Sequence, residues 1–236
     1  MTFVIIHFNT PELTTCLCSS FRKFHMTDTL VIFDNSDKRP FINSSLFDTI
    51  YIDNTQQQII NFEKEFSKYS IDSHVWQINK LGSAKHTFTI DWIIQNINDT
   101  AICILDSDIL IKKKIDFCDE RMITAGELNL QEQNDRRYLQ YKRPPRILPY
   151  IQFLNVSTLK KLNIRFFDHN KIMGFNINAR PYDTGCSFFE TLLKKKQHTY
   201  INTNITLRDY MVHYKGGSWA NTDYKRWLLQ YKSLWQ

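Results

Sequence analysis

The chain has 236 residues, of which 42% are hydrophobic and 23% are charged. No apolar run approaches the roughly 18 residues that cross a membrane, so we expect a globular domain with a sizeable core and no signal peptide or membrane span. Residues 1–100 hold 8 Lys and Arg against 11 Asp and Glu, a net charge of −3, whereas residues 101–236 hold the other 22 and 13, a net charge of +9. A basic second half indicates an anionic partner, such as a phosphate-bearing substrate, an acidic membrane surface or nucleic acid, unless it is a solvated face.

Strand and helix signals alternate along residues 1–100. A strand over residues 3–8 precedes a helix start, with Thr10 as a candidate N-cap and Pro11 as the first helical residue. Further strands are expected over residues 29–33 and 49–52, and helices over residues 59–69 and from an N-cap at Ser83 to Ile97. Since parallel strands need crossover connections that are usually helical, this alternation predicts an α/β fold with a mainly parallel central sheet flanked by helices.

The run from Ala101 to Leu105 is apolar throughout and is followed by Asp106, Ser107 and Asp108. This pattern predicts a buried parallel strand whose carboxyl end carries two acids. Residues two apart in an extended chain point the same way, so both carboxylates can face one site, and a hard divalent cation would relieve their repulsion. The alternative is a solvated Asp-Ser-Asp turn that closes a core strand.

The second half continues with short elements separated by two loops. We expect strands over residues 123–128, 150–156 and 200–205, helices over residues 157–162 and 188–196, and loops over residues 129–146 and 168–182. The last helix, residues 222–236, is amphipathic. Its apolar stripe consists of Tyr224, Trp227, Leu228, Tyr231 and Leu234, and its basic residues are Lys225, Arg226 and Lys232. Such a helix suits packing on its own domain or docking at an anionic membrane.

The five cysteines are scattered along the chain, with no C-x-x-C motif: Cys16, Cys18, Cys103, Cys118 and Cys186. An odd and dispersed set favours reduced structural thiols and a cytoplasmic location. Membrane docking by the last helix would make that location peripheral to the membrane.

Six blocks follow one another in a characteristic order: a strand over residues 3–9, Val31 to Asp37, Gly82 to His86, Leu105 to Asp108, Tyr182 to Gly185, and His213 to Trp219. This succession resembles the GT-A glycosyltransferases, most closely the bacterial family 2-like group that uses nucleotide sugars. The resemblance covers most of the chain, and it depends on the order of the blocks, because a D-x-D motif alone is common.

The resemblance implies one GT-A (Rossmann-like) domain over residues 1–236. Residues 1–110 would form the nucleotide-sugar donor half, residues 111–221 the acceptor half, and residues 222–236 the amphipathic helix. It implies a metal-dependent transfer of a sugar, with inversion, from a UDP- or GDP-sugar to a hydroxyl of a glycan or lipid-linked acceptor. The cofactor would be Mn²⁺ or Mg²⁺, and no nucleic acid partner is expected.

The resemblance also assigns roles to residues. Donor-binding positions are Asn9, Asp34, Ser83, His86 and Asp106; metal ligands are Asp106, Asp108 and His213; the catalytic base is Asp183, with Glu127 as the next acid to test. Some of these residues have a structural alternative. Asp34 could form an Asx-turn, His86 could be a packed side chain, and Asp183 could cap a helix. For His213 the alternative is an ordinary strand histidine.

Three other functions remain open. A nucleotidyltransferase that makes sugar nucleotides also uses a metal on a similar sheet, but residues 9–12 lack the Gly-rich basic loop expected to hold a triphosphate. A nucleic-acid-binding module would use the basic second half, yet it leaves the acid pair unexplained. A catalytically inactive relative that serves as a scaffold is the third.

Overall fold

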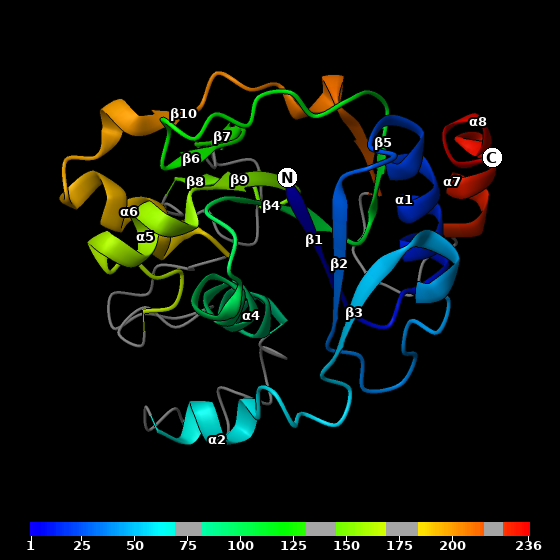
Figure 1. Ribbon diagram of the computed structural model, residues 1–236, viewed down its shortest axis with the longest axis horizontal. Helices are drawn as coiled ribbons and strands as arrows, with labels where there is room; N and C mark the ends of the chain where they lie inside the picture. Colours follow the sequence, from blue (N-terminus) through cyan, green and yellow to red (C-terminus); the bar gives the residue numbers. More distant parts are fainter. Residues whose placement is uncertain (69–81, 131–144, 169–183, 215–223) are drawn as a thin grey trace, which may run out of the picture.

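A seven-stranded sheet in the order β10-β6-β9-β4-β1-β2-β3 forms the centre of the protein (Figure 1). The computed structural model describes residues 1–68, 82–130, 145–168, 184–214 and 224–236. Four neighbouring strands are parallel: β1 (Thr2–His7), β2 (Thr29–Asp34), β3 (Thr49–Asp53) and β4 (Ile102–Asp106). The apolar runs of the sequence therefore predicted these strands and their orientation correctly.

The other side of the sheet contains one reversed strand. β9 (Ile151–Leu154) runs antiparallel to β4 and to β6 (Thr124–Ala125), and β6 is parallel to β10 (Ile201–Asn202). Two small antiparallel sheets pair β5 (Ile109–Ile111) with β11 (Met211–His213), and β7 (Leu128–Asn129) with β8 (Arg146–Ile147). The sheet is thus mainly parallel, as expected for this α/β fold.

Helices cover both faces of the sheet, with α1, α7 and α8 on one side and α4, α5 and α6 on the other (Figure 1). Their bounds are α1 (Pro11–Phe24), α2 (Phe62–Ser67), α4 (Gly82–Asn96), α5 (Val156–Leu162), α6 (Cys186–Lys194), α7 (Tyr224–Gln230) and α8 (Lys232–Trp235). Alternate residues of the strands divide the core between the two faces. In β4, Ile104 packs in the cluster that holds Ile90 of α4, whereas Leu105 packs in the cluster that holds Phe21 of α1.

Some expected helix bounds were wrong: α2 and α6 begin and end at other residues than expected. Ser83 does not cap α4 but lies inside it, because the helix already begins at Gly82. The helix over residues 157–162 begins one residue earlier, and its cap is Asn155, whose side-chain oxygen accepts the N–H of Thr158 at 2.9 Å. Thr10 is the N-cap residue of α1 and Pro11 is its first residue, as expected, although the Thr10 side chain forms no capping hydrogen bond.

The last helix is divided at Tyr231 into α7 and α8, and its aromatic stripe packs on its own domain. Tyr224, Trp227, Tyr231 and Leu234 surround a buried cluster that includes Leu13, Cys16, Leu110, Tyr214 and Leu228. No helix of the described residues is long and apolar enough to cross a membrane. All five cysteines are free thiols, as expected.

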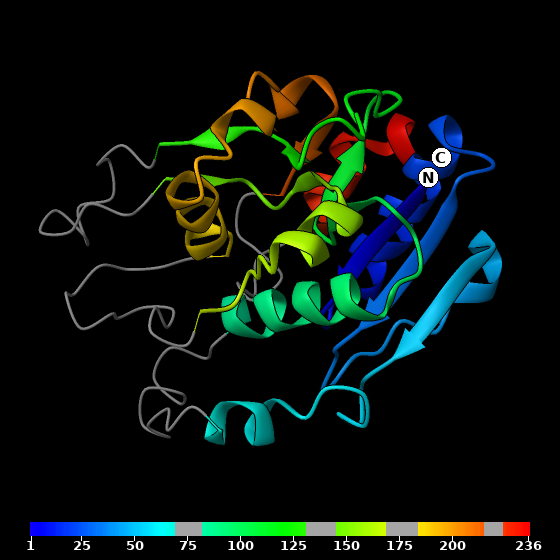
Figure 2. The same cartoon turned by 60° about the vertical axis from the view of Figure 1, so that its left-hand side comes forward.

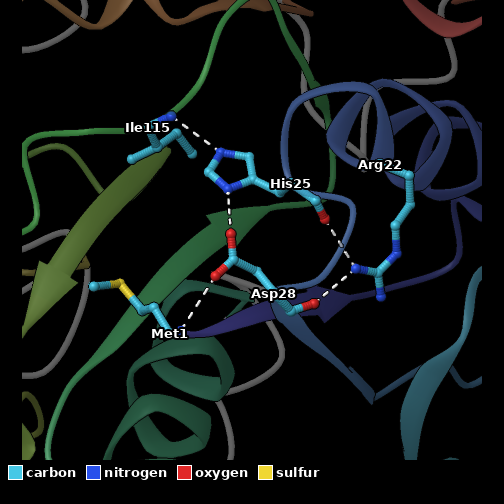
Figure 3. Close-up of polar contacts among 5 residues, drawn as sticks. All are labelled: Met1, Arg22, His25, Asp28 and Ile115. Atoms are coloured by element: carbon cyan, nitrogen blue, oxygen red, sulfur yellow. Dashed lines mark hydrogen bonds and ion pairs between the residues drawn. The ribbon is translucent and has the colours of Figure 1, made fainter.

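A buried histidine joins α1 to β2 and to the segment after β5 (Figure 3). The Nδ1 atom of His25 lies 2.8 Å from Oδ2 of Asp28, and its Nε2 atom accepts the N–H of Ile115 at 3.0 Å. Its ring stacks on Phe21 with 4.6 Å between ring centres. Arg22 donates to the backbone carbonyls of both His25 and Asp28. Burial lowers the pKa of His25 despite the nearby carboxylate, so the neutral ring with its proton on Nδ1 satisfies both contacts.

Candidate active site

Strands β1, β2 and β4 end at the same edge of the sheet, and polar side chains follow each of them. The strand register places His7 beside Asp34 and Ile6 beside Asp106. Open α/β sheets bind their ligands at the carboxyl ends of their strands. The described donor-side and metal candidates all lie on segments near this edge.

Asp34 is completely buried at the end of β2. Its carboxylate accepts the N–H groups of Ser36 (2.8 Å) and Phe41 (2.7 Å) and the hydroxyl of Tyr51 (2.7 Å). Burial, together with the bond to this carboxylate, raises the pKa of Tyr51. Asp34 therefore shapes the loop after β2, and the Asx-turn is present. A contact between Asp34 and the nucleotide stays a prediction.

Asn9 connects the loops that follow β1 and β2. Its backbone has a positive φ of 57°, a conformation that asparagine tolerates better than most residues. Its side-chain oxygen accepts the N–H groups of Lys38 (3.0 Å) and Arg39 (2.9 Å), and its own N–H donates to Ser36 Oγ (2.9 Å). Asn9 thus supports the loop beside Asp34, and its predicted role in donor binding also stays a prediction.

Helix α4 reaches the same edge with its first turns. His86 lies there half-buried, and Ser83 lies within the helix. Lys85, which the sequence did not single out, holds its Nζ atom 5.7 Å from the ring centre of Phe8 and 5.4 Å from that of Phe62. A cation between two aromatic faces is stabilised electrostatically. α4 therefore brings a positive charge to the predicted donor half.

Buried amides tie α4 to the loops after β2 and β3. Asn35 donates its side-chain amide to Thr89 Oγ1 at 2.8 Å and accepts the amide of Asn54 at 2.8 Å. The side-chain oxygen of Asn54 in turn accepts the N–H groups of Ile59 (3.1 Å) and Ile60 (2.8 Å). A buried amide has few alternative hydrogen-bond partners, so this network holds the rim of the donor half in a defined shape.

The first acid of the pair, Asp106, is the last residue of β4 and is half-buried. Its N–H donates to the carbonyl of Tyr150 at 3.0 Å, and its Oδ1 accepts the N–H of Ser107 at 3.0 Å. Ser107 Oγ lies 3.4 Å from Oγ1 of Thr10, at the start of α1. The acid pair is therefore tied to segments on both sides of β4. Ser107 and Asp108 do form a turn, but this turn is buried and not solvated.

Asp108 and His213 meet although they are distant in the sequence. The antiparallel pairing of β5 with β11 places His213 opposite Ile109, and the N–H of Tyr214 donates to the carbonyl of Asp108 at 2.9 Å. Nε2 of His213 consequently lies 3.3 Å from Oδ1 of Asp108, whose side chain is only 7% exposed. The contact is not a hydrogen bond, since Oδ1 receives no hydrogen bond from the described residues. Two of the three predicted metal ligands are thus brought together.

Tyr150 supports both sides of this pair and was not expected from the sequence. Its carbonyl holds Asp106, and its ring stacks on His213 with 4.0 Å between ring centres and 27° between planes. The stacking fixes the direction in which Nε2 of His213 points. Within the described ranges, no group of three or more His, Cys, Asp or Glu side chains forms a complete metal site. The chain itself therefore supplies a carboxylate and an imidazole, which are ligands that Mn²⁺ accepts.

Asp183, the predicted base, lies outside the described residues. Its neighbours do not: Arg146 donates to the carbonyl of Thr184 at 3.1 Å, and Gly185 has a φ of 86°. A Cβ at Gly185 would lie 3.2 Å from the carbonyl oxygen of Ile147, so glycine is needed there to pack against β8.

Glu127, the second candidate base, adjoins the same small sheet. Its carbonyl accepts the N–H of Leu148 at 2.9 Å, and its Oε2 accepts the N–H of Leu207 at 2.6 Å. Glu127 and the residues that follow Asp183 therefore both attach to the β7–β8 pair, in the half of the protein predicted to bind the acceptor.

No protein-family model matches the chain, and no curated protein sequence matches it. Solved structures that are similar over nearly its whole length include two glycosyltransferases. The galactosyltransferase LgtC, in complex with donor and acceptor sugar analogues, is 11% identical with a TM-score of 0.52, and the alignment covers 99% of this chain and 95% of LgtC. The bifunctional glycosyltransferase WbbM, in its apo form, is 12% identical with a TM-score of 0.50, and the alignment covers 98% of this chain but 51% of WbbM. Identities this low show the fold alone, and the chain has the fold of the GT-A glycosyltransferases.

Proposed function

We propose that the protein is a glycosyltransferase that moves a sugar from a UDP- or GDP-sugar to a hydroxyl of a glycan or lipid-linked acceptor. The observation that supports this most is the 3.3 Å contact between Asp108 and His213 beside the carboxyl end of β4, on a glycosyltransferase fold. The similar LgtC structure contains donor and acceptor sugar analogues, which supports the binding of two sugar substrates by such a fold.

The proposed cofactor is Mn²⁺ or Mg²⁺, held by Asp108 and His213, with Asp106 as a further ligand or as a contact to the ribose. A buried carboxylate oxygen without a hydrogen-bond donor is costly, and a bound cation would offset that cost. When bound, the ion would act as a Lewis acid that neutralises the charge growing on the departing nucleoside diphosphate. Asp34, Asn9, Ser83 and His86 would complete the donor side of the site.

The acceptor hydroxyl needs a base, because it is a weak nucleophile until a carboxylate removes its proton. We propose Asp183 for this role, with Glu127 as the alternative, and an inverting reaction in which the hydroxyl attacks opposite the leaving group. Glu127 and the residues that follow Asp183 attach to β7 and β8, which supports a base that approaches from the acceptor side. The anomeric configuration of the product, read by NMR, tests the inverting course directly.

A membrane-bound acceptor suits the outer surface of α7 and α8. The aromatic stripe of these helices packs inward, while Lys225, Arg226 and Lys232 are exposed next to Leu229, which is 68% exposed. We propose that this outward face meets an anionic membrane surface from the cytoplasm. Co-sedimentation with vesicles rich in anionic lipid tests this, and the Lys225→Glu, Arg226→Glu double variant should lose the interaction. Absence of wild-type binding at low salt would refute the membrane contact without affecting the transfer reaction.

A thermal-shift panel of nucleoside diphosphates and sugar nucleotides, with and without Mn²⁺, tests the proposed function. A ligand at about 100 times its dissociation constant should stabilise the protein by roughly 2.7 kcal/mol. The stabilisation should require Mn²⁺, disappear in Asp108→Ala and persist in Asp99→Ala, which removes an exposed acid at the other end of β4. Release of nucleoside diphosphate with sugar transfer identifies a glycosyltransferase, whereas formation of a sugar nucleotide from a triphosphate identifies the nucleotidyltransferase. Metal-independent binding of nucleic acid alone would favour the nucleic-acid-binding module.

A further inference from the structure

Strand β3 is the edge of the central sheet (Figures 1 and 2). It pairs with β2 on one side, and none of the described strands pairs with its other side. Open strand edges invite pairing with another chain, and proteins usually protect them with charges, prolines or a bulge. The five residues of β3, Thr49 to Asp53, contain no proline and carry a charge only at the final position.

The pairing with β2 determines which backbone groups face outward. In a parallel pair, alternate residues of a strand direct both backbone groups to the same neighbour. The N–H of Asn54 donates to the carbonyl of Asp34 in β2, so Ile52 and Ile50 also face β2. Thr49, Tyr51 and Asp53 therefore point their N–H and C=O groups away from the sheet.

The outward-facing backbone groups of Thr49, Tyr51 and Asp53 are complementary to those of a second copy of the strand. If a second β3 approached in the antiparallel direction with Tyr51 opposite its own copy, Thr49 of each chain would lie opposite Asp53 of the other. Each of these outward pairs could exchange two hydrogen bonds. The only charged side chain of the strand would then face a hydroxyl group and not a like charge.

The side chains around the edge also favour an isologous contact. Ile50 is 57% exposed, and in this register it would lie directly opposite Ile52 of the other chain, on the same face of the sheet. The segment that leads into β3 exposes two more large apolar side chains, Ile42 at 80% and Leu46 at 72%. A two-fold axis would bring equivalent apolar groups from both chains to the same contact.

We propose that two copies of the chain form a dimer by pairing their β3 strands antiparallel about Tyr51, which joins the two central sheets into one. The proposal concerns assembly and does not depend on the transfer reaction. β3 is also the edge of the donor half, so the acceptor half attached to β7 and β8 would lie on the far side of each sheet from the contact.

Sedimentation velocity over a concentration series of the full chain tests the proposal. The wild type should sediment as a dimer, and Ile50→Lys should sediment as a monomer, since it places a charge opposite an apolar residue without disturbing the monomer. Leu193→Lys makes the same change at a 42% exposed leucine on α6 and should remain dimeric. A monomeric wild type, or a dimer that survives Ile50→Lys, would overturn the proposal.

Cross-linking tests the register itself. Opposed residues of an antiparallel pair have Cβ atoms about 4.5–5.5 Å apart, close to the geometry of a disulfide, whereas diagonal neighbours are about 7–8 Å apart. The Ile50→Cys, Ile52→Cys double variant should therefore form an intermolecular disulfide under mild oxidation. Ile50→Cys alone should not, because its own copy lies on the diagonal. Cross-linking of the single variant, or none in the double variant, would exclude this register.

Discussion

His213 Nε2 lies 3.3 Å from Asp108 Oδ1, and the position of each residue depends on the other's strand. Asp108 precedes β5 and His213 ends β11, so the pairing of these three-residue strands creates the contact. Pairing of short strands far apart in the sequence costs loop-closure entropy, which the surrounding packing must offset. Leu110 of β5 supplies part of that packing, as it is buried in the cluster covered by α7 and α8. The C-terminal helices thus support the proposed metal site.

Asp108→Asn should weaken metal-dependent ligand binding without lowering the free energy of unfolding. The variant keeps the shape of the side chain but loses its charge, so Mn²⁺-dependent binding of a nucleoside diphosphate should weaken at least tenfold, about 1.4 kcal/mol. Without metal, its free energy of unfolding should equal or exceed that of the wild type, because the buried carboxylate oxygen has no hydrogen-bond donor. Calorimetric titration and urea denaturation measure the two quantities. Unchanged metal-dependent binding would remove Asp108 from the site.

Tyr150→Leu should weaken the same binding by a smaller amount. It removes the ring that stacks on His213 but leaves the backbone carbonyl that holds Asp106. A stacked aromatic pair contributes about 0.5–1.5 kcal/mol, so the dissociation constant should rise about threefold to tenfold. Tyr150→Phe keeps the ring and serves as the matched control. If both variants bind equally well, the stacking does not position His213.

The sequence predicted the parts of the fold that have strong local patterns. The apolar runs of β1, β2 and β4 and the apolar stripe of the last helix pack as expected. The reversed direction of β9 was not predictable, because an antiparallel strand buried on both faces has the same apolar pattern as a parallel one.

The candidate site was predictable only in part. The acid pair was visible in the sequence, and the resemblance supplied His213 as its partner. β5 and β11 are too short to show a pattern, so their pairing could not be derived from local sequence. The role of Tyr150 depends wholly on a tertiary stacking contact, and the bonds of Asp34 depend on how the chain returns at Phe41 and Tyr51.

Acidification should destabilise the protein through His25. Burial lowers its pKa in the folded state, whereas an unfolded chain titrates near the ordinary value of about 6.5. As the pH falls below about 6.5, the unfolded state takes up a proton that the folded state resists, so the free energy of unfolding decreases. His7, whose pKa burial also lowers, should act in the same direction. Asp91, whose pKa burial raises to about 7, acts in the opposite direction, so the contribution of His25 is the difference in slope between the wild type and a His25 variant in urea denaturation from about pH 8 to pH 5.

His25→Gln tests the assignment of that slope. Glutamine cannot titrate, so the loss of stability on acidification should be smaller in this variant than in the wild type. At neutral pH the variant should lose about 1–3 kcal/mol, because the N–H of Ile115 and the carboxylate of Asp28 lose well-placed partners in a buried position. An unaltered pH slope in His25→Gln would assign the acid sensitivity to other groups.

The identity of the base can be decided by comparing Asp183→Asn with Glu127→Gln. Each substitution preserves side-chain shape and one acceptor oxygen but removes the basic group. Glu127 Oε2 already accepts the N–H of Leu207, a bond that glutamine can keep, so Glu127→Gln should remain folded.

Loss of a catalytic base should reduce turnover by about 10² or more with nearly unchanged donor affinity. We expect this pattern for Asp183→Asn and near-normal turnover for Glu127→Gln. The reverse result would place the base on Glu127, where the β7–β8 pair holds it in a defined position. If both variants transfer sugar at the wild-type rate, neither acid removes the acceptor proton.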